Sequence, residues 1–214
     1  MNKRSMDTGF SLVELLIAVS ILAGIVGGAY SLYGTGLDTY QAGVTNTDVD
    51  RRTAQVLESI ADDLSTSGRD VVYPVPAHPS STAKISLQKN LGFVSGAVKW
   101  GPPTVIFFRH AKDDPNDGKD NNGNGLIDEG EVVRIVNAGT PEERETVLTR
   151  FVREHLEGEV PNGKDDNGNG LVDECGLSFD SIGQVWTIRL TLERRDANGN
   201  LCTQTVQTAV KMRN

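Results

Sequence analysis

The feature that most constrains this chain is an uncharged stretch near its start. Residues 15–37 are 23 consecutive positions without Asp, Glu, Lys or Arg. As an α-helix, such a stretch is about 34 Å long at a rise of about 1.5 Å per residue. The hydrocarbon core of a membrane is about 30 Å thick. The stretch therefore predicts a membrane-spanning helix.

The charges that flank this stretch predict how the chain is oriented. Glu14 stands immediately before it, where a carboxylate costs up to about 2.5–3.5 kcal/mol if it reaches the bilayer centre. We therefore expect an oppositely charged partner for Glu14. Lys3 and Arg4 precede the stretch, and the next basic residues are Arg51 and Arg52. This distribution predicts a single pass with a cytoplasmic amino terminus and an exported remainder.

The beginning of the chain resembles the type IV pilin superfamily, which includes pilins, minor pilins and the pseudopilins of type II secretion. The resemblance is carried by Gly9, Phe10, Glu14 and the apolar run that follows. It implies that prepilin peptidase removes residues 1–9 as a leader and that Phe10 becomes the methylated terminus. It also implies that Glu14 neutralises the α-amino group of a neighbouring subunit. A secretory signal peptide would have a shorter apolar region before a small-residue cleavage site, and an ordinary anchor gives Glu14 no role.

The helix is predicted to continue beyond the membrane. Residues 38–67 contain no proline, and apolar side chains recur at helical spacing. These apolar positions are Ala54, Leu57, Ile60, Ala61 and Leu64. We expect one helix over about residues 11–66, with residues 10–37 in the membrane or filament core and residues 38–68 as an amphipathic half.

A proline-rich connection follows, and then the pattern becomes that of strands, with many β-branched and aromatic residues. The alternation over residues 185–192 predicts a sheet with one face on a core, which the amphipathic half of the helix would complete. The predicted fold class is α+β, a long N-terminal helix packed against an antiparallel sheet, with residues 69–214 as the β-rich head. Within the superfamily, this order is most similar to PilW-type minor pilins and J-type minor pseudopilins. The predicted strands are 84–87, 104–110, 131–137, 146–153, 184–194 and 201–212.

The head contains an internal repeat. Residues 117–129 read DGKDNNGNGLIDE, and 45 positions later residues 162–174 read NGKDDNGNGLVDE. Both copies resemble the calcium loop of EF-hands and related loops without flanking helices, which bind the ion through six to eight oxygen atoms. The alternative is that these Asn-Gly and Asp-Gly runs are only turn formers.

The resemblance implies two calcium-type loops, at residues 117–131 and 162–176, holding one or two structural calcium ions. The second loop has Gly176 where the final glutamate belongs, and Glu174 is the expected substitute. The implied ligands of the first loop are Asp120, Asn122, Asn124, the Leu126 carbonyl, Asp128 and Glu131, and Ile127 is its implied apolar tether. Those of the second are Asp165, Asn167, Asn169, the Leu171 carbonyl, Asp173 and Glu174.

The two cysteines, Cys175 and Cys202, are too far apart for a zinc or redox motif, and no histidine cluster accompanies them. In an exported domain they are disulfide candidates. A bond between them would contribute about 3 kcal/mol in the chain-entropy model. Two free thiols are the alternative.

Composition and motifs together favour a structural role. The formal net charge of −8 argues against nucleic acid as a partner. The chain has no nucleophile elbow, phosphate-binding glycine loop or zinc spacing, so we predict no enzymatic activity. The predicted function is a minor pilin of a type IV pilus, with prepilin peptidase, the inner membrane and other pilins or pseudopilins as partners. The alternatives are a minor pseudopilin of type II secretion and a calcium-dependent adhesive surface protein.

Overall fold

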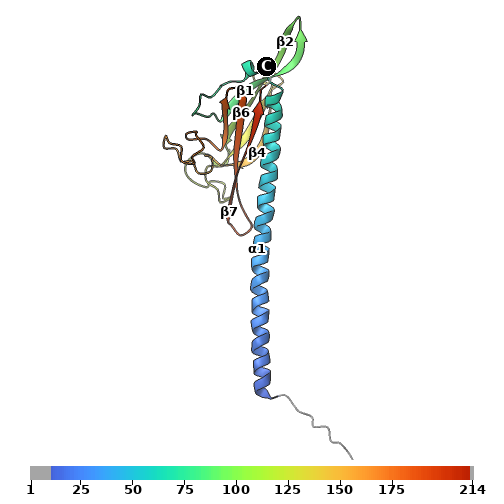
Figure 1. Ribbon diagram of the computed structural model, residues 1–214, viewed down its shortest axis with the longest axis vertical. Helices are drawn as coiled ribbons and strands as arrows, with labels where there is room; N and C mark the ends of the chain where they lie inside the picture. Colours follow the sequence, from blue (N-terminus) through green and yellow to red (C-terminus); the bar gives the residue numbers. More distant parts are fainter. Residues whose placement is uncertain (1–10, 213–214) are drawn as a thin grey trace, which may run out of the picture. The chain divides into compact units, whose positions relative to one another are not determined.

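The computed structural model describes residues 11–212 and consists there of a long helix, a short 3₁₀ turn and a seven-stranded antiparallel sheet (Figure 1). The predicted α+β class is thereby confirmed. Two compact units divide the chain, residues 1–43 and residues 44–214, and each is described by itself. The elements are α1 (Leu12–Ser65), η1 (Arg69–Val71), β1 (Lys84–Val94), β2 (Ala97–His110), β3 (Gly130–Val136), β4 (Arg144–Val152), β5 (Leu177–Ile182), β6 (Val185–Arg195) and β7 (Leu201–Lys211).

The first unit contains the amino-terminal part of α1, which presents apolar side chains on all sides. Consecutive residues such as Leu15, Leu16 and Ile17 are each more than half exposed. Among the described residues, α1 is the one helix that is long and apolar enough to cross a membrane. An apolar surface of this extent has to be covered by lipid or by other protein helices.

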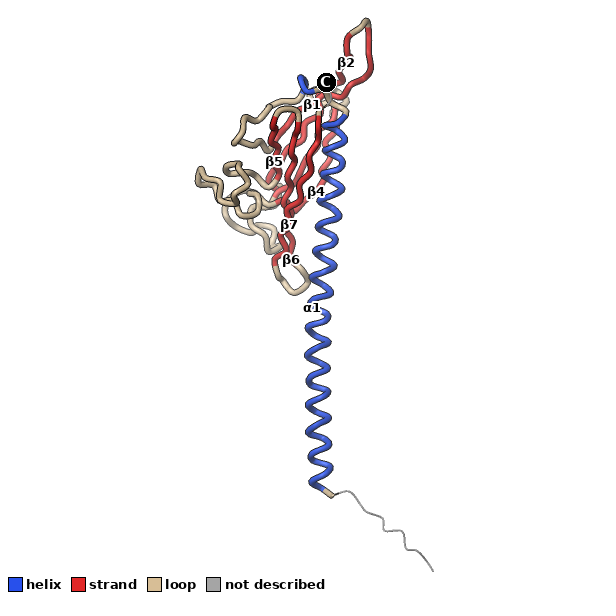
Figure 2. Tube along the Cα trace, viewed as in Figure 1, coloured by secondary structure: helices blue, strands red, loops and turns tan. Residues whose placement is uncertain are grey.

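In the second unit, the remaining part of α1 supplies one side of the hydrophobic core. Its buried positions follow helical spacing from Val49 through Ile60 to Leu64. Ala54, which the sequence reading assigned to this face, is exposed, and Thr53 and Val56 are buried instead. Figure 2 shows the strands beside this part of the helix. The core also includes Val72, Ile85, Leu87, Ile106, Val132, Val152, Leu177, Phe179, Trp186, Ile188, Leu190 and Leu192.

The sheet has the order β1-β2-β3-β4-β6-β5. β7 pairs with the edge of β6 that lies opposite to β5. β6 and β7 pair over their full length, from Val185–Lys211 to Arg195–Leu201. β4 meets β6 only at Val152–Leu192, so most of the edge of β4 is not paired with β6. The predicted strands at residues 131–137, 146–153, 184–194 and 201–212 correspond to β3, β4, β6 and β7.

The structure differs from the predicted strands in two respects. β5 was not predicted, because its alternation of apolar and polar residues covers only Leu177 to Asp180 and two of its buried positions, Ser178 and Asp180, are polar. Asp180 is acceptable there because Arg189 of the neighbouring strand pairs with it. The first two predicted strands are also longer than expected. β1 and β2 extend into a hairpin that turns at Ser95 and Gly96 and leaves Phe93 exposed.

An ion-pair cluster joins α1 to the sheet. The Asp63 carboxylate is almost fully buried, and its Oδ2 accepts a hydrogen bond from Arg134 Nη1 of β3 at 3.0 Å. Its Oδ1 lies 2.6 Å from Lys89 Nζ of β1. Arg134 also donates to Ser59 Oγ at 3.1 Å. The cluster thus links one turn of the helix to two separate strands.

The predicted disulfide between Cys175 and Cys202 is wrong, because both cysteines are free in this structure. Cys202 is the second residue of β7 and lies opposite Arg194 of β6, whereas Cys175 precedes β5, on the other edge of β6. Segments separated by an intervening strand are about 10 Å apart. A disulfide requires Cα atoms about 4.4–6.8 Å apart.

Candidate functional site

The predicted processing residues Gly9 and Phe10 lie outside the described residues, which begin at Ser11. Glu14 is in the first turn of α1 and forms a reciprocal cap with Ser11. The Ser11 amide donates to Glu14 Oε2 at 3.0 Å, and the Glu14 amide lies 3.5 Å from Ser11 Oγ. This is the Ser-x-x-Glu capping box, which satisfies amide groups that the first turn leaves unpaired. Glu14 therefore has a local role in the helix, besides the assembly role that the resemblance implies.

The two repeated loops have the same hydrogen bonds between backbone amides and an aspartate side chain. Asp120 Oδ1 accepts the Gly123 amide at 2.7 Å, and its Oδ2 accepts the Gly125 amide at 2.8 Å. In the second loop, Asp165 does the same for Gly168 and Gly170, at 2.7 and 2.8 Å. These loops contain few backbone pairs of their own, so side-chain carboxylates satisfy the amides.

A second aspartate closes each loop. Asp128 accepts hydrogen bonds from the amides of Asp117 and Gly118, both at 2.9 Å. Asp173 accepts the corresponding bonds from Asn162 and Gly163, also at 2.9 Å. The four aspartates of the predicted ligand sets therefore have a structural task that requires no ion.

Within each loop, one apolar side chain holds the backbone against the protein. Leu126 and Leu171 are 4% and 1% exposed. Ile127, which the sequence reading assigned as the apolar tether, is 61% exposed. Tethering thus falls one residue earlier, on the residues expected to offer carbonyl oxygens to calcium.

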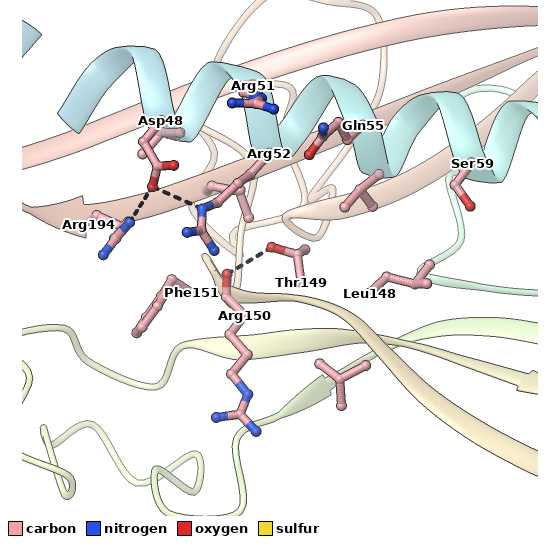
Figure 3. Close-up of a pocket in the computed structure, with 14 residues that line it drawn as sticks. Asp48, Arg51, Arg52, Gln55, Ser59, Leu148, Thr149, Arg150, Phe151 and Arg194 are labelled. Carbon is pink, nitrogen blue, oxygen red and sulfur yellow. Dashed lines mark hydrogen bonds and ion pairs between the residues drawn. The ribbon is translucent and has the colours of Figure 1, made fainter. Parts of the chain in front are cut away.

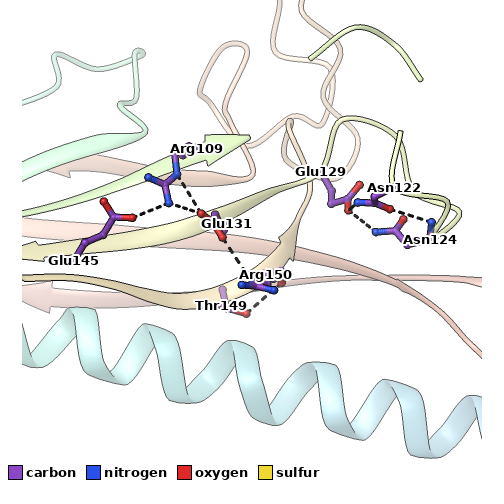
Figure 4. A network of polar contacts seen from close by, with 8 residues as sticks. All are labelled: Arg109, Asn122, Asn124, Glu129, Glu131, Glu145, Thr149 and Arg150. Carbon is purple, nitrogen blue, oxygen red and sulfur yellow. Dashed lines mark hydrogen bonds and ion pairs between the residues drawn. The ribbon is translucent and has the colours of Figure 1, made fainter. Parts of the chain in front are cut away.

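Glu131 is not part of the polar cluster of the first loop. It lies in β3, where Oε1 accepts from Arg109 Nε at 3.1 Å and Oε2 faces Arg150 at 3.7 Å (Figure 4). Glu145 completes this network by accepting from Arg109 at 2.8 Å. Hydrogen bonds to Glu131 and Glu145 raise the pKa of Arg109. Glu131 thus takes part in an ion-pair network on the sheet rather than in an EF-hand-type site.

Gly176, the counterpart of Glu131 in the repeat, cannot bear a ligand side chain. A Cβ atom built on Gly176 would lie 1.8 Å from the Arg153 carbonyl oxygen. The close approach allows the Gly176 amide to bond the Glu154 carbonyl at 2.9 Å. The second loop therefore has no carboxylate at the position that closes an EF-hand site, and in the first loop the Glu131 carboxylate at that position is paired with arginines on the sheet.

The carboxylates that the loops do bring inward are a different set. Asp114 and Glu129 are 0% and 3% exposed, and their side chains contact one another. Glu159 and Glu174 are 3% and 0% exposed in the second loop. Only Glu174 belonged to the predicted ligands. The sequence signal for the others is the repeat itself, because its 45-residue spacing also aligns Asp114 with Glu159 and Glu129 with Glu174.

Amide side chains of the predicted ligand sets surround these buried carboxylates. Asn122 Nδ2 donates to Glu129 Oε1 at 2.9 Å, and Asn124 Nδ2 also donates to this atom (Figure 4). Asn169 Nδ2 donates to Glu174 Oε1 at 2.6 Å. Asn167 contributes its backbone amide, which bonds Glu159 Oε1 at 3.1 Å.

Burial sets the ionisation of these carboxyls. Desolvation raises the pKa of Glu129, and its contact with Asp114 adds to the shift. The same contact lowers the pKa of Asp114. Desolvation likewise raises the pKa of Glu174, with a smaller contribution in the same direction from the Glu159 charge. Within residues 11–212, no three His, Cys, Asp or Glu side chains gather as a metal-binding group.

A separate groove of about 700 Å³ lies between α1 and the edge of β4 (Figure 3). It opens there because β4 pairs with β6 at a single position. Asp48 Oδ2 accepts from Arg52 at 2.9 Å and from Arg194 at 2.7 Å at one end of the groove. The groove therefore has a basic lining in which this aspartate is already paired.

Residues 4–30 match the family model described as the prokaryotic N-terminal methylation motif. The match covers the last part of the predicted leader, the predicted processing residues Gly9 and Phe10 and the first part of α1, and it does not extend into the head. It supports a pilin-like or pseudopilin-like subunit of the kind that prepilin peptidase cleaves. No curated protein and no solved structure matches the chain.

Proposed function

We propose that this chain is a structural subunit of a type IV pilus, a minor pilin that is assembled through its N-terminal helix. The observation that carries the proposal is the methylation motif at residues 4–30, which leads directly into the exposed apolar part of α1. A motif that directs cleavage in front of such a helix provides both a membrane anchor and a filament-forming surface. The motif belongs to structural subunits, and we propose no catalytic activity.

The proposed course begins in the inner membrane, with residues 1–9 in the cytoplasm and the head exported. Removal of the leader at Gly9 leaves Phe10 as a positively charged terminus. In the filament, Glu14 pairs with the terminal amine of a neighbouring subunit, because two opposite charges in a low-dielectric core compensate each other's desolvation. The two loops and the β1–β2 hairpin enlarge the head, which favours a minor position over a closely packed major subunit.

The capping box makes the Glu14 hypothesis testable against a local alternative. Glu14→Ala removes both the charge and the acceptor of the cap. Glu14→Gln removes the charge but keeps a side-chain oxygen for the Ser11 amide, because glutamine also forms capping boxes. If Glu14 pairs with a terminal amine, both variants are cleaved and inserted normally but enter filaments poorly.

The measurement is the amount of each variant in sheared filaments relative to the membrane pool. Ser11→Ala, which weakens the cap without changing the charge, is the matched control and should enter filaments. Normal incorporation of Glu14→Gln would overturn the pairing role and leave helix capping as the explanation.

We further propose that the two loops bind calcium, which has a structural role in the head. The support is their polar composition and the buried carboxylates that they enclose. Calcium prefers several oxygen ligands on a flexible loop, and outside the cell it is abundant enough for weak sites to be filled.

A further inference from the structure

The structure assigns each cation site to a buried carboxylate pair, Asp114 with Glu129 in the first loop and Glu159 with Glu174 in the second. These pairs take the place of the EF-hand set that includes Glu131. The inference rests on the calcium proposal and deepens it, because it identifies the residues that supply the negative charge. Its basis is a set of buried oxygen atoms without donors.

Each of the four carboxylates has one satisfied and one unsatisfied oxygen. Asp114 Oδ1 accepts the Asn121 amide at 2.7 Å, whereas Asp114 Oδ2 is buried without a hydrogen-bond partner. Glu129 Oε1 accepts from the two asparagines, whereas Oε2 is unpartnered. Glu159 and Glu174 repeat the arrangement, each with its Oε2 buried and unpartnered.

A buried acceptor without a partner is destabilising, and a charged one is more so. Two ionised carboxylates cannot satisfy one another, since neither has a proton to donate. A divalent cation between them would neutralise the two charges and provide a partner for both free oxygens. Four such atoms at repeat-related positions are therefore better explained by two ion sites than by four independent defects.

The backbone explains why these residues meet in both copies. The Ala111 amide bonds the Glu129 carbonyl at 3.1 Å, and the Asp114 amide bonds the Ala111 carbonyl at 3.1 Å. In the second copy, Leu156 bonds Glu174 at 2.9 Å, and Glu159 bonds Leu156 at 3.0 Å. The structural repeat thus covers residues 111–129 and 156–174. Each carboxylate pair lies where the two ends of the loop are joined.

The chemistry of the oxygen atoms that would bind the ion fits calcium. Carboxylate oxygens supply two negative charges per loop, and the amide oxygens of Asn122, Asn124, Asn167 and Asn169 lie on the same loops. Each of these amide oxygens accepts one backbone amide, and a carbonyl-type oxygen retains a second lone pair. All the proposed calcium ligands are hard oxygen atoms on loops with several glycines, and no thiol or imidazole is needed.

The test compares conservative variants of the full chain in detergent micelles. Bound calcium is counted after equilibrium dialysis, and thermal unfolding is followed by tryptophan fluorescence in calcium and in chelator. Wild type should bind two ions. Glu129→Gln and Glu174→Gln should each bind one, and the double variant none. Glu131→Gln, the control at the EF-hand position, should keep both ions.

The melting temperatures separate an ion site from a purely structural role. In chelator, Glu129→Gln should melt at or above wild type, because it removes one of two adjacent buried charges. In calcium at about a hundredfold above Kd, wild type should gain about 5–10 °C per filled site, and this variant should lose the gain from its own site. A merely structural glutamate would lower the melting temperature equally in both conditions.

Each outcome has a distinct meaning. Retention of two ions by Glu129→Gln, together with loss of one by Glu131→Gln, overturns the carboxylate-pair assignment but leaves calcium binding intact. Absence of bound calcium in wild type overturns the calcium proposal as a whole. Equal protection by Mg²⁺ at the same concentration overturns the assignment to calcium.

Discussion

Replacing Asp63 by alanine tests how the second unit holds α1 against the sheet. The Asp63 side chain is 4% exposed and receives Arg134 at 3.0 Å and Lys89 at 2.6 Å. A hydrogen bond to a charged group is worth about 1.5–3 kcal/mol. Arg134 is 26% exposed and Lys89 is 46% exposed, so solvent screens both pairs and the lysine pair adds little. We expect a loss of about 2 kcal/mol.

For a domain of this size, that loss lowers the melting temperature by about 4–8 °C. The assay is thermal unfolding of the full chain in detergent micelles, followed by the fluorescence of Trp186, which is 2% exposed in the core. Asp62→Ala is the matched control, because Asp62 is the exposed neighbour on the same turn. It should change stability by no more than about 0.5 kcal/mol.

A second variant excludes a change in helix propensity as the cause of the lower melting temperature of Asp63→Ala. Arg134→Met changes β3 rather than α1, and it leaves the buried Asp63 carboxylate with Lys89 alone. It should therefore destabilise at least as much as Asp63→Ala, since an uncompensated buried charge is costly. Melting of both variants within about 1 °C of Asp62→Ala would refute the reasoning.

Two further predictions concern the loop region and the last hairpin. Gly176→Ala should destabilise the head by more than about 3 kcal/mol or prevent folding, because its Cβ would lie 1.8 Å from a backbone oxygen, whereas Gly43→Ala, with nothing within 4 Å, should fold normally; circular dichroism and the melting temperature compare them. Hydrogen bonds, foremost from Asn200, lower the pKa of Asp196 below 3.8. The stabilisation by Asp196 should thus be full above pH 3.8 and lost as the pH falls through its lowered value. Hydrogen exchange of the Asn198 and Asn200 amides should accelerate at that pH relative to other loop amides, and an unchanged ratio would contradict the capping role.

Local patterns in the sequence were sufficient for the features that depend on neighbouring residues. The helix, the α+β class and the strand positions of β3, β4, β6 and β7 follow from apolar periodicity, which is a property of a short window. The loops were found for the same reason, because the repeated Asp, Asn and Gly residues form their hydrogen bonds with residues no more than 11 positions away. The burial of Leu126 in place of Ile127 was missed, because only the packed protein determines which of two adjacent apolar residues faces inward.

Features that depend on distant residues required the tertiary structure. β5 is a short strand, and its buried Asp180 is tolerated only because Arg189 lies beside it on the next strand. The cysteines remain free because β6 separates them, a fact of strand order that no local pattern contains. Glu131 and Gly176 occupy equivalent repeat positions but form an ion pair on the sheet and a close backbone contact, so the EF-hand analogy ends at the residues that enter the sheet.

The sequence by itself determined that an N-terminal methylation motif leads into an apolar helix, and that two polar loops repeat in the head. These are properties of consecutive residues, which charge, periodicity and spacing express directly. Only the tertiary structure decided which carboxylates are buried. Asp114 is 15 residues from Glu129, and the two meet because the Ala111 amide bonds the Glu129 carbonyl and closes the loop. That closure buries the carboxylates and leaves one oxygen atom of each without a hydrogen-bond donor. This property distinguishes Asp114, Glu129, Glu159 and Glu174 from the other acidic residues of the loops.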